Sequence, residues 1–424
     1  MKTFDHAVCP FCALVCDDLT IRCDGNRLSL ADDFPQFCRS SYARASEITT
    51  TKPRYKGKQI TISEATAVAT TMLKRAKHPL FGGLIADIQD MRALLPLARQ
   101  CNATLDHVDS DKVLRNLRVM QSYGVVGTTF SEIRNRADLI IFIGSKLFDD
   151  YPRLLQRLYR TTRDSKPRTK SVLIGDWQVA NIPEILQGNC DIINTPDSQF
   201  PEFIRRFGMH VQQRFNNKLN KATYDEKIAA DTPYSALLDD IEYAEYPVII
   251  WSSSDMDYPH ADLGITLISR LIKKINLKKH CTGLALRGNR GAGNMQSVCL
   301  WQSGYPGHVS FNSEQAYYNP LHNRSDKLLN EQRADLLVWI ASIHPQTPPP
   351  VDLPTIAFVH PAIAEQTTSD LVVPVGIPGV DHRGYSQRTD SVVILPLPKL
   401  RDCALPALPD ILRDIQQQLN KKSA

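Results

Sequence analysis

The sequence of 424 residues has no long hydrophobic run, and no stretch approaches the roughly 20 consecutive apolar residues of a membrane-spanning helix. Its first residues, Met1-Lys2-Thr3-Phe4-Asp5-His6, lack the apolar core and cleavage site of a secretory signal. With 42% hydrophobic and 22% charged residues, the composition is ordinary for a globular protein. We therefore expect a cytoplasmic protein of two or three domains that does not contact a membrane.

Neither sign of charge dominates, because 50 Lys and Arg residues stand against 45 Asp and Glu residues, a net charge of +5. This small, dispersed excess argues against nucleic-acid binding. The sequence also lacks a G-x-S-x-G motif, an H-x-H metal motif and a P-loop. His344, His360 and His382 have no partnered nucleophile nearby in the sequence, so we interpret them as structural.

Cysteine is concentrated at the N-terminus, where five of the ten cysteines lie within the first 38 residues. Cys9, Cys12 and Cys16 have the spacing C-x2-C-x3-C, and Cys38 supplies a fourth thiol. Four thiolates suit a [4Fe-4S] cluster or a zinc ion, and the unequal spacing favours the cluster. The alternative is an apolar hairpin with spare cysteines. Cys23 falls in a plausible strand and is not expected to be a ligand.

Short apolar runs recur in two similar series, as is typical of strands buried on both faces of a parallel sheet. Each series contains an Ala-Asp-Leu run that ends in Ser, at 137–145 and at 334–342. The remaining runs lie at 80–85, 171–175 and 190–194 in the first series and at 247–251, 354–359 and 369–374 in the second. The pattern predicts an α/β fold with two pseudo-related Rossmann-like domains and mainly parallel sheets, unless the two series are alike by chance.

The predicted domain boundaries follow the chain. Residues 1–55 form a small cysteine-rich domain, 56–245 a first α/β domain with a helical connector at 208–246, 246–395 a second α/β domain, and 396–424 a C-terminal extension. Thr61-Ile62-Ser63-Glu64 fits a capping box and predicts a helix start. A last helix is expected at 408–420.

A glycine-rich loop spans residues 287–294. Successive backbone N–H groups in such a loop can cradle an anion. The candidate ligand-binding residues are Arg287, Arg290, Gly291, Gly293 and Asn294. The alternative is a turn between domains whose arginines face solvent.

Four segments in this order resemble the B subunit of formylmethanofuran dehydrogenase, within the molybdopterin oxidoreductase superfamily. They are the N-terminal Cys-Pro-x-Cys-x3-Cys-Asp-Asp, residues 131–145, Trp301-Gln302-Ser303-Gly304-Tyr305-Pro306, and residues 369–380. The resemblance runs from about residue 7 to about residue 395. It implies a molybdopterin-oxidoreductase-like fold, a [4Fe-4S] cluster, and a molybdenum or tungsten ion held by two pterin dinucleotides and by a cysteine of a Cys-His-Gly-Pro segment.

The sequence departs from this family at the metal. The span that corresponds to the Cys-His-Gly-Pro segment, residues 110–118, contains no cysteine, and Cys101 lies too far upstream. Two loops that reach the pterin in the family are altered, at Gly144-Ser145-Lys146-Leu147 and at Tyr151-Pro152-Arg153. We therefore expect no molybdenum or tungsten pterin and no catalytic residue in this chain, because side chains alone cannot carry formate redox chemistry.

These departures resemble the B subunit of the formyltransferase/hydrolase complex of methylotrophic bacteria. The resemblance implies a non-catalytic subunit of a complex that converts formyl-tetrahydromethanopterin to formate through formyl-methylofuran. Its partners would be the hydrolase (the A subunit), the C subunit and the formyltransferase (the D subunit), and Arg287 and Arg290 would face an acidic ligand such as the methylofuran tail. Two alternatives stay open: an active B subunit of a formylmethanofuran dehydrogenase with an unusual ligand set, and an independent binding module.

Overall fold

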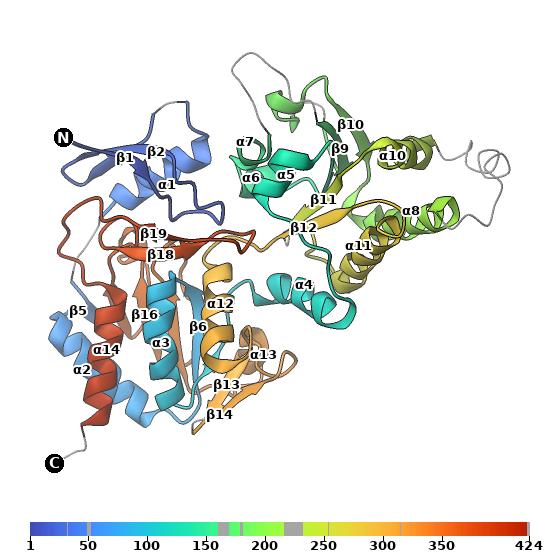
Figure 1. Cartoon of the computed structure of the whole chain (residues 1–424). Helices are drawn as coiled ribbons and strands as arrows, with labels where there is room; N and C mark the ends of the chain where they lie inside the picture. The colour runs from blue at the N-terminus through green and yellow to red at the C-terminus, as the bar shows by residue number, and fades with distance from the viewer. Residues whose placement is uncertain are drawn as a thin grey trace. The chain divides into compact units, whose positions relative to one another are not determined.

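The computed structural model describes residues 1–421 except 32, 49–51, 160–168, 179–180, 216–231, 253 and 314. The chain forms two compact units (Figure 1). The first unit contains Met1–Ser110 and Asn289–Ala424, and the second contains Asp111–Gly288. The second unit is therefore inserted in the chain of the first.

The first unit is built on a nine-stranded sheet whose centre is parallel. Its five parallel strands stand in the order β7-β6-β15-β16-β17, and short antiparallel strands extend both edges. The parallel strands are β6 (Pro79–Ile85), β7 (Thr104–Leu105), β15 (Leu336–Ala341), β16 (Thr355–Val359) and β17 (Leu371–Pro374). The edges are β4 (Arg54–Tyr55), β5 (Lys58–Gln59), β13 (Val309–Asn312) and β14 (Gln315–Tyr318). All residues of β6, β15, β16 and β17 are buried, as their apolar runs predict.

Helices cover this sheet with apolar faces. They are α2 (Ile62–Arg75), α3 (Ile88–Gln100), α12 (Ala292–Ser303), α13 (Ser325–Asn330) and α14 (Leu408–Asn420). The capping box predicted at Thr61 is confirmed, because its hydroxyl accepts the Glu64 N–H while the Glu64 carboxylate accepts the Thr61 N–H at 2.7 Å. Helix α14 has the predicted bounds and packs on α2 and α3, where Leu408, Ile411 and Leu412 join the core.

The N-terminal segment is tied to the C-terminal part of the same unit. It contains β1 (Lys2–Ala7), β2 (Leu19–Asp24), β3 (Arg27–Ser29) and α1 (Gln36–Ser46), and the C-terminal part contributes the hairpin of β18 (Gly384–Gln387) and β19 (Ile394–Leu397). The buried Arg401 guanidinium bonds to the Asp381 carboxylate at 2.7 Å. It also donates to the carbonyl oxygens of Asn26 and Ala45, at 2.6 and 2.8 Å. These bonds link three separate segments of the chain.

The second unit contains a five-stranded, fully parallel sheet in the order β10-β9-β8-β11-β12. The strands are β8 (Leu139–Ile143), β9 (Lys170–Gly175), β10 (Cys190–Asn194), β11 (Pro247–Ser252) and β12 (Thr282–Leu286). The helices are α4 (Ser110–Tyr123), α5 (Phe130–Arg136), α6 (Leu147–Asp150), α7 (Leu154–Leu158), α8 (Phe200–Phe215), α10 (Thr232–Tyr243) and α11 (Ala261–Ile275). Of the predicted connector, residues 216–231 lie outside the described residues.

The mixed α/β architecture with parallel sheets agrees with the prediction, but the units divide the chain differently from the predicted domains. Strand β6, from a run assigned to the first α/β domain, shares a sheet with β15, β16 and β17. Strand β11, from a run assigned to the second, extends the sheet of β8, β9 and β10. Strands β7 and β12, which also join these sheets, were not predicted. Apolar runs identify buried strands without specifying which strand each one pairs with, so grouping them in chain order missed this exchange. No helix in the described part of the chain is both long and apolar enough to span a bilayer.

Candidate functional sites

The four N-terminal cysteines lie close together in the first unit. The loop between β1 and β2 closes on itself, because the Cys9 N–H donates to the Cys16 carbonyl at 2.8 Å and the Val15 N–H to the Cys12 carbonyl at 3.1 Å. Helix α1 carries Cys38, and all four side chains are buried. The strand predicted around Cys23 is confirmed as β2. The Cys23 thiol donates to the Gly25 carbonyl.

Burial and the neighbouring cysteines oppose ionisation of the Cys9 and Cys12 thiols, because both raise the pKa of these groups. Burial, together with the neighbouring Cys16 and Cys38, raises the pKa of Cys9 to about 12. The pKa of Cys12 is raised well above its usual range by burial and then by Cys16, Cys9 and Cys38. A bound cation would reverse this effect, since a coordinated thiol is a thiolate. Among the described residues, no three His, Cys, Asp or Glu side chains converge as a single metal ion requires.

The glycine-rich loop crosses from one unit to the other. Arg287 belongs to the second unit and Arg290 to the first. The Arg290 Nε donates to the Asp109 carboxylate at 2.9 Å, and Nη1 donates to the Gln346 side chain at 3.1 Å. The Arg290 carbonyl also lies 3.1 Å from Nε2 of His107. Arg290 is thus engaged within its own unit, and its predicted ligand-binding role stays a prediction.

The other three candidate residues of this loop stand at the start of α12. Gly291 has φ +75°, and a Cβ there would lie 2.5 Å from the Ala86 carbonyl oxygen, so the loop packs directly on the end of β6. Asn294 is 2% exposed, donates to the same carbonyl at 3.2 Å and accepts the Gln387 N–H at 2.8 Å. Gly293 has open space around it. Gly291 and Asn294 therefore have a packing role, and none of their contacts assigns them a ligand.

Two buried carboxyl groups beyond the carboxyl end of β6 were not predicted from the sequence. Asp87 and Asp90 form the capping box of α3, and both side chains are buried. The Asp87 carboxylate accepts the N–H groups of Asp90 and Tyr385, at 2.7 and 2.8 Å, and Asp90 accepts the Ser342 hydroxyl at 2.6 Å. Burial, together with the neighbouring Asp90, raises the pKa of Asp87 to about 8, and burial raises that of Asp90 to about 6. The Asp-x-x-Asp spacing after a buried strand was the available signal.

A third carboxyl group occupies the corresponding edge of the second unit. Asp255 follows β11, and its carboxylate accepts the Lys146 N–H at 2.9 Å. Gly144, with φ +105°, ends β8 so close to Asp255 that a Cβ on Gly144 would overlap the carboxyl carbon. Burial, together with the nearby Asp150 and Asp197, raises the pKa of Asp255 to about 7.

The strand-end histidines are held in structural roles, as the sequence analysis expected. Burial lowers the pKa of His344 to about 4 and that of His360 to about 3. The Nδ1 atom of His360 accepts the Ala362 N–H at 3.2 Å, and His382 contacts the carbonyls of Gly376 and Arg383. The neutral, buried rings of His344 and His360, without a nucleophile beside them, point to packing rather than to proton transfer.

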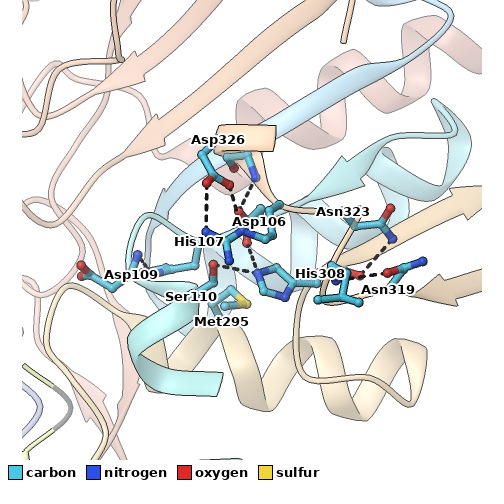
Figure 2. Close-up of polar contacts among 12 residues, drawn as sticks. Asp106, His107, Asp109, Ser110, Met295, His308, Asn319, Asn323 and Asp326 are labelled. Atoms are coloured by element: carbon cyan, nitrogen blue, oxygen red, sulfur yellow. Dashed lines mark hydrogen bonds and ion pairs between the residues drawn. The ribbon is translucent and has the colours of Figure 1, made fainter. Parts of the chain in front are cut away.

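A buried Asp–His–Ser cluster lies in the first unit (Figure 2). The Nε2 atom of His308 is 3.1 Å from the Asp106 carboxylate and 3.0 Å from the Ser110 hydroxyl. In a catalytic triad the acid and the nucleophile contact opposite nitrogens of the ring. Here both contact the same nitrogen, and all three side chains are buried. The cluster is therefore not arranged for nucleophilic catalysis.

No family model matches the chain. Two curated proteins are similar over nearly its whole length. The B subunit of tungsten-containing formylmethanofuran dehydrogenase 2 from Methanocaldococcus jannaschii is 24% identical over 448 residues, covering 100% of this chain and 99% of that protein. The protein of the same name from Methanococcus maripaludis is 21% identical, covering 93% of both.

A bacterial protein is also similar. The B subunit of the formyltransferase/hydrolase complex Fhc from Methylorubrum extorquens is 23% identical over 331 residues, which cover 76% of this chain and 84% of that protein. The crystal structure of the formyltransferase/hydrolase complex (FhcABCD) from the same organism, in complex with methylofuran, contains a chain of the same fold. That chain has a TM-score of 0.72 and 21% identity, and the match covers 87% of this chain and 98% of that one. The resemblance found in the sequence is thereby confirmed.

Proposed function

We propose that this chain is the non-catalytic B subunit of a cytoplasmic formyltransferase/hydrolase complex of one-carbon metabolism. The complex converts formyl-tetrahydromethanopterin to formate through formyl-methylofuran. Its transferase and hydrolase sites belong to the D and A subunits, and this chain supports the assembly together with the C subunit. The similarity to the B subunit of Fhc and to a chain of the FhcABCD structure supports this assignment.

One observation carries the proposal. The span in which the resemblance places the thiolate ligand of molybdenum or tungsten forms the first turns of α4, residues 110–118, and contains no cysteine. The nearest upstream cysteine, Cys101, ends α3 and packs against the core of the first unit. Burial raises the pKa of Cys101 to about 12, so it is not predisposed to be a thiolate.

The second candidate function is that of an active B subunit of formylmethanofuran dehydrogenase. Two of the similar proteins are named as tungsten-containing enzymes, and Cys9, Cys12, Cys16 and Cys38 remain together. In our proposal these thiols hold a [4Fe-4S] cluster or a zinc ion. Their spacing in the sequence and their burial support this assignment, and a bound group would act as a cross-link between the β1–β2 loop and α1.

The finer fold assignment is part of the same proposal. We regard the two sheets as related Rossmann-like domains that arose by duplication. In both sheets, three strands that are consecutive in the chain lie side by side, and a second pair of consecutive strands extends the sheet next to the first of the three. The parallel strands have the order β7-β6-β15-β16-β17 in the first unit and β12-β11-β8-β9-β10 in the second. The cysteine-rich segment is then an addition to the first of them.

The two functions differ in electron transfer. Formyl hydrolysis releases formate without electrons, whereas the dehydrogenase reaction must reduce an acceptor. The purified complex should release formate from formyl-tetrahydromethanopterin and methylofuran without reducing a viologen dye. Dye reduction that depends on the formyl donor would overturn the proposal.

A further inference from the structure

Ligands of parallel α/β sheets bind beyond the carboxyl ends of the strands, at the point where the strand order reverses. In the second unit the chain builds β8, β9 and β10 toward one edge and then places β11 and β12 on the other side of β8. The reversal therefore lies between β8 and β11. In the first unit it lies between β6 and β15, because β7 and β16 extend the sheet in opposite directions from these two strands.

In the second unit the Asp255 carboxyl group fills this position. It follows β11, overlies Gly144 at the end of β8 and accepts the Lys146 N–H. One of its oxygens, Oδ2, is buried and has no hydrogen-bond partner among the described residues. The cavity that remains beside Gly144 and Gly175 has a volume of about 10 Å³. This is at most the room for a single water molecule.

In the first unit Asp87 and Asp90 fill the same position. They follow β6, and Asp90 is joined to Ser342 at the end of β15 by a hydrogen bond of 2.6 Å. A Cβ on Gly384 would overlap the Asp87 carboxylate, so the β18–β19 hairpin is packed directly on it. Both aspartates are at most 1% exposed.

We propose that buried carboxyl groups of the chain itself fill the space beyond the strand ends at both points where the strand order reverses, between β8 and β11 and between β6 and β15. We call these two places the switch-point crevices. Neither unit then binds a nucleotide or dinucleotide phosphate there. Backbone N–H groups that would cradle a phosphate, those of Lys146, Asp90 and Tyr385, already donate to these carboxyl groups. A phosphate would have to displace a carboxyl group from these N–H groups. The pterin dinucleotide implied by the family resemblance does not fit these crevices.

This inference deepens the proposed function and rests on it only for the choice of ligand class.

The inference is tested by equilibrium dialysis of the assembled complex with labelled GDP near neutral pH. We expect no saturable binding by the native complex, and none by a complex with Asp255→Asn, because asparagine keeps the volume of the side chain. Binding of about one GDP per native chain, weakened by Gly144→Val, would overturn the proposal.

A second measurement tests whether Asp255 is enclosed. Because the pKa of Asp255 is higher in the folded chain than in the unfolded chain, Asp255 takes up a proton on folding. The stability that this protonation provides is lost as pH rises from about 4 to about 7. Asp255→Asn should flatten the fall of Tm in this range, and the exposed Asp176→Asn should not. An unchanged pH dependence in Asp255→Asn would show that the carboxyl group is not buried in the crevice and would contradict the inference.

The two proposals fail in different ways. GDP binding by a complex that contains neither molybdenum nor tungsten would overturn the closed crevices and leave the proposed function intact. Molybdenum or tungsten in the complex would overturn the proposed function itself.

Discussion

Asp138 and Asp335 make the same contacts in two different sheets. Asp138 accepts the backbone N–H groups of the two residues before Pro247, at 2.6 and 2.9 Å. Asp335 accepts those of the two residues before Pro79, also at 2.6 and 2.9 Å. Each aspartate thus fixes the start of the neighbouring parallel strand, β11 or β6. The aspartates of the two Ala-Asp-Leu runs thus have the same structural role.

Removing either carboxylate should weaken the strand start that it holds. Asp138→Ala and Asp335→Ala each leave two N–H groups without their partner, and we expect losses of about 1–2 kcal/mol in the free energy of unfolding, since these groups can still reach water. The Asp→Asn variants keep one acceptor and should lose less. Urea denaturation of the four variants checks this order, and equal stability of Ala and Asn variants would contradict it.

Cys12→Ser should disrupt the N-terminal segment and the assembly without changing the chemical step. Serine is a poor ligand for iron or zinc, so a metal that links the β1–β2 loop to α1 should be lost. Cys23→Ser is the matched control, because Cys23 is also buried and its thiol donates to the Gly25 carbonyl. Metal content and size-exclusion chromatography of both variants measure the effect. Full assembly of Cys12→Ser with unchanged metal content would refute the cross-link.

The pair of Asp87 and Asp90 should make the first unit less stable as pH rises. Both folded pKa values lie above the unfolded value of about 3.9, so the folded chain binds more protons than the unfolded chain above that pH. Their contribution is complete below about pH 4 and is lost as pH rises to about 8. The facing groups are Ser342, His382 and the Tyr385 N–H. Asp87→Asn should reduce this loss, measured as Tm against pH, whereas the exposed Asp414→Asn should follow the native curve.

Arg290 and Asp109 should be coupled energetically. Their ion pair is partly exposed, so a double-mutant cycle of Arg290→Ala and Asp109→Ala should give a coupling energy of about 0.5–1 kcal/mol. If Arg290 instead serves an acidic ligand, Arg290→Ala should raise the KM for methylofuran and Asp109→Ala should not. The comparison of stability and KM for the two variants separates the roles.

Local features of the fold were predictable because short-range physics determines them. The capping box at Thr61 marks the start of α2, and the helix at 408–420 has the expected bounds. Buried strands such as β8 and β15 follow from their apolar runs. Strand pairing was not predictable in this way, because β6 and β11 have equally apolar sequences and only long-range contacts decide which sheet each one joins.

The candidate site was only partly accessible from the sequence. The proximity of the four cysteines was expected from their spacing, and their mutual effects on pKa agree with it. Asp87 and Asp255 were missed, since an aspartate after a strand usually serves as an ordinary helix cap or loop residue. Their hydrogen bonds and the packing of Gly384 and Gly144 against them reveal their position.

The central claim is that the ancestral redox centre is absent from this subunit. The most direct test is elemental analysis of the anaerobically purified native complex for molybdenum, tungsten, iron and zinc. Our account predicts neither molybdenum nor tungsten, with iron or zinc bound at the N-terminal cysteines. Molybdenum or tungsten near one atom per copy of this chain would contradict the account and identify the protein as part of an active oxidoreductase.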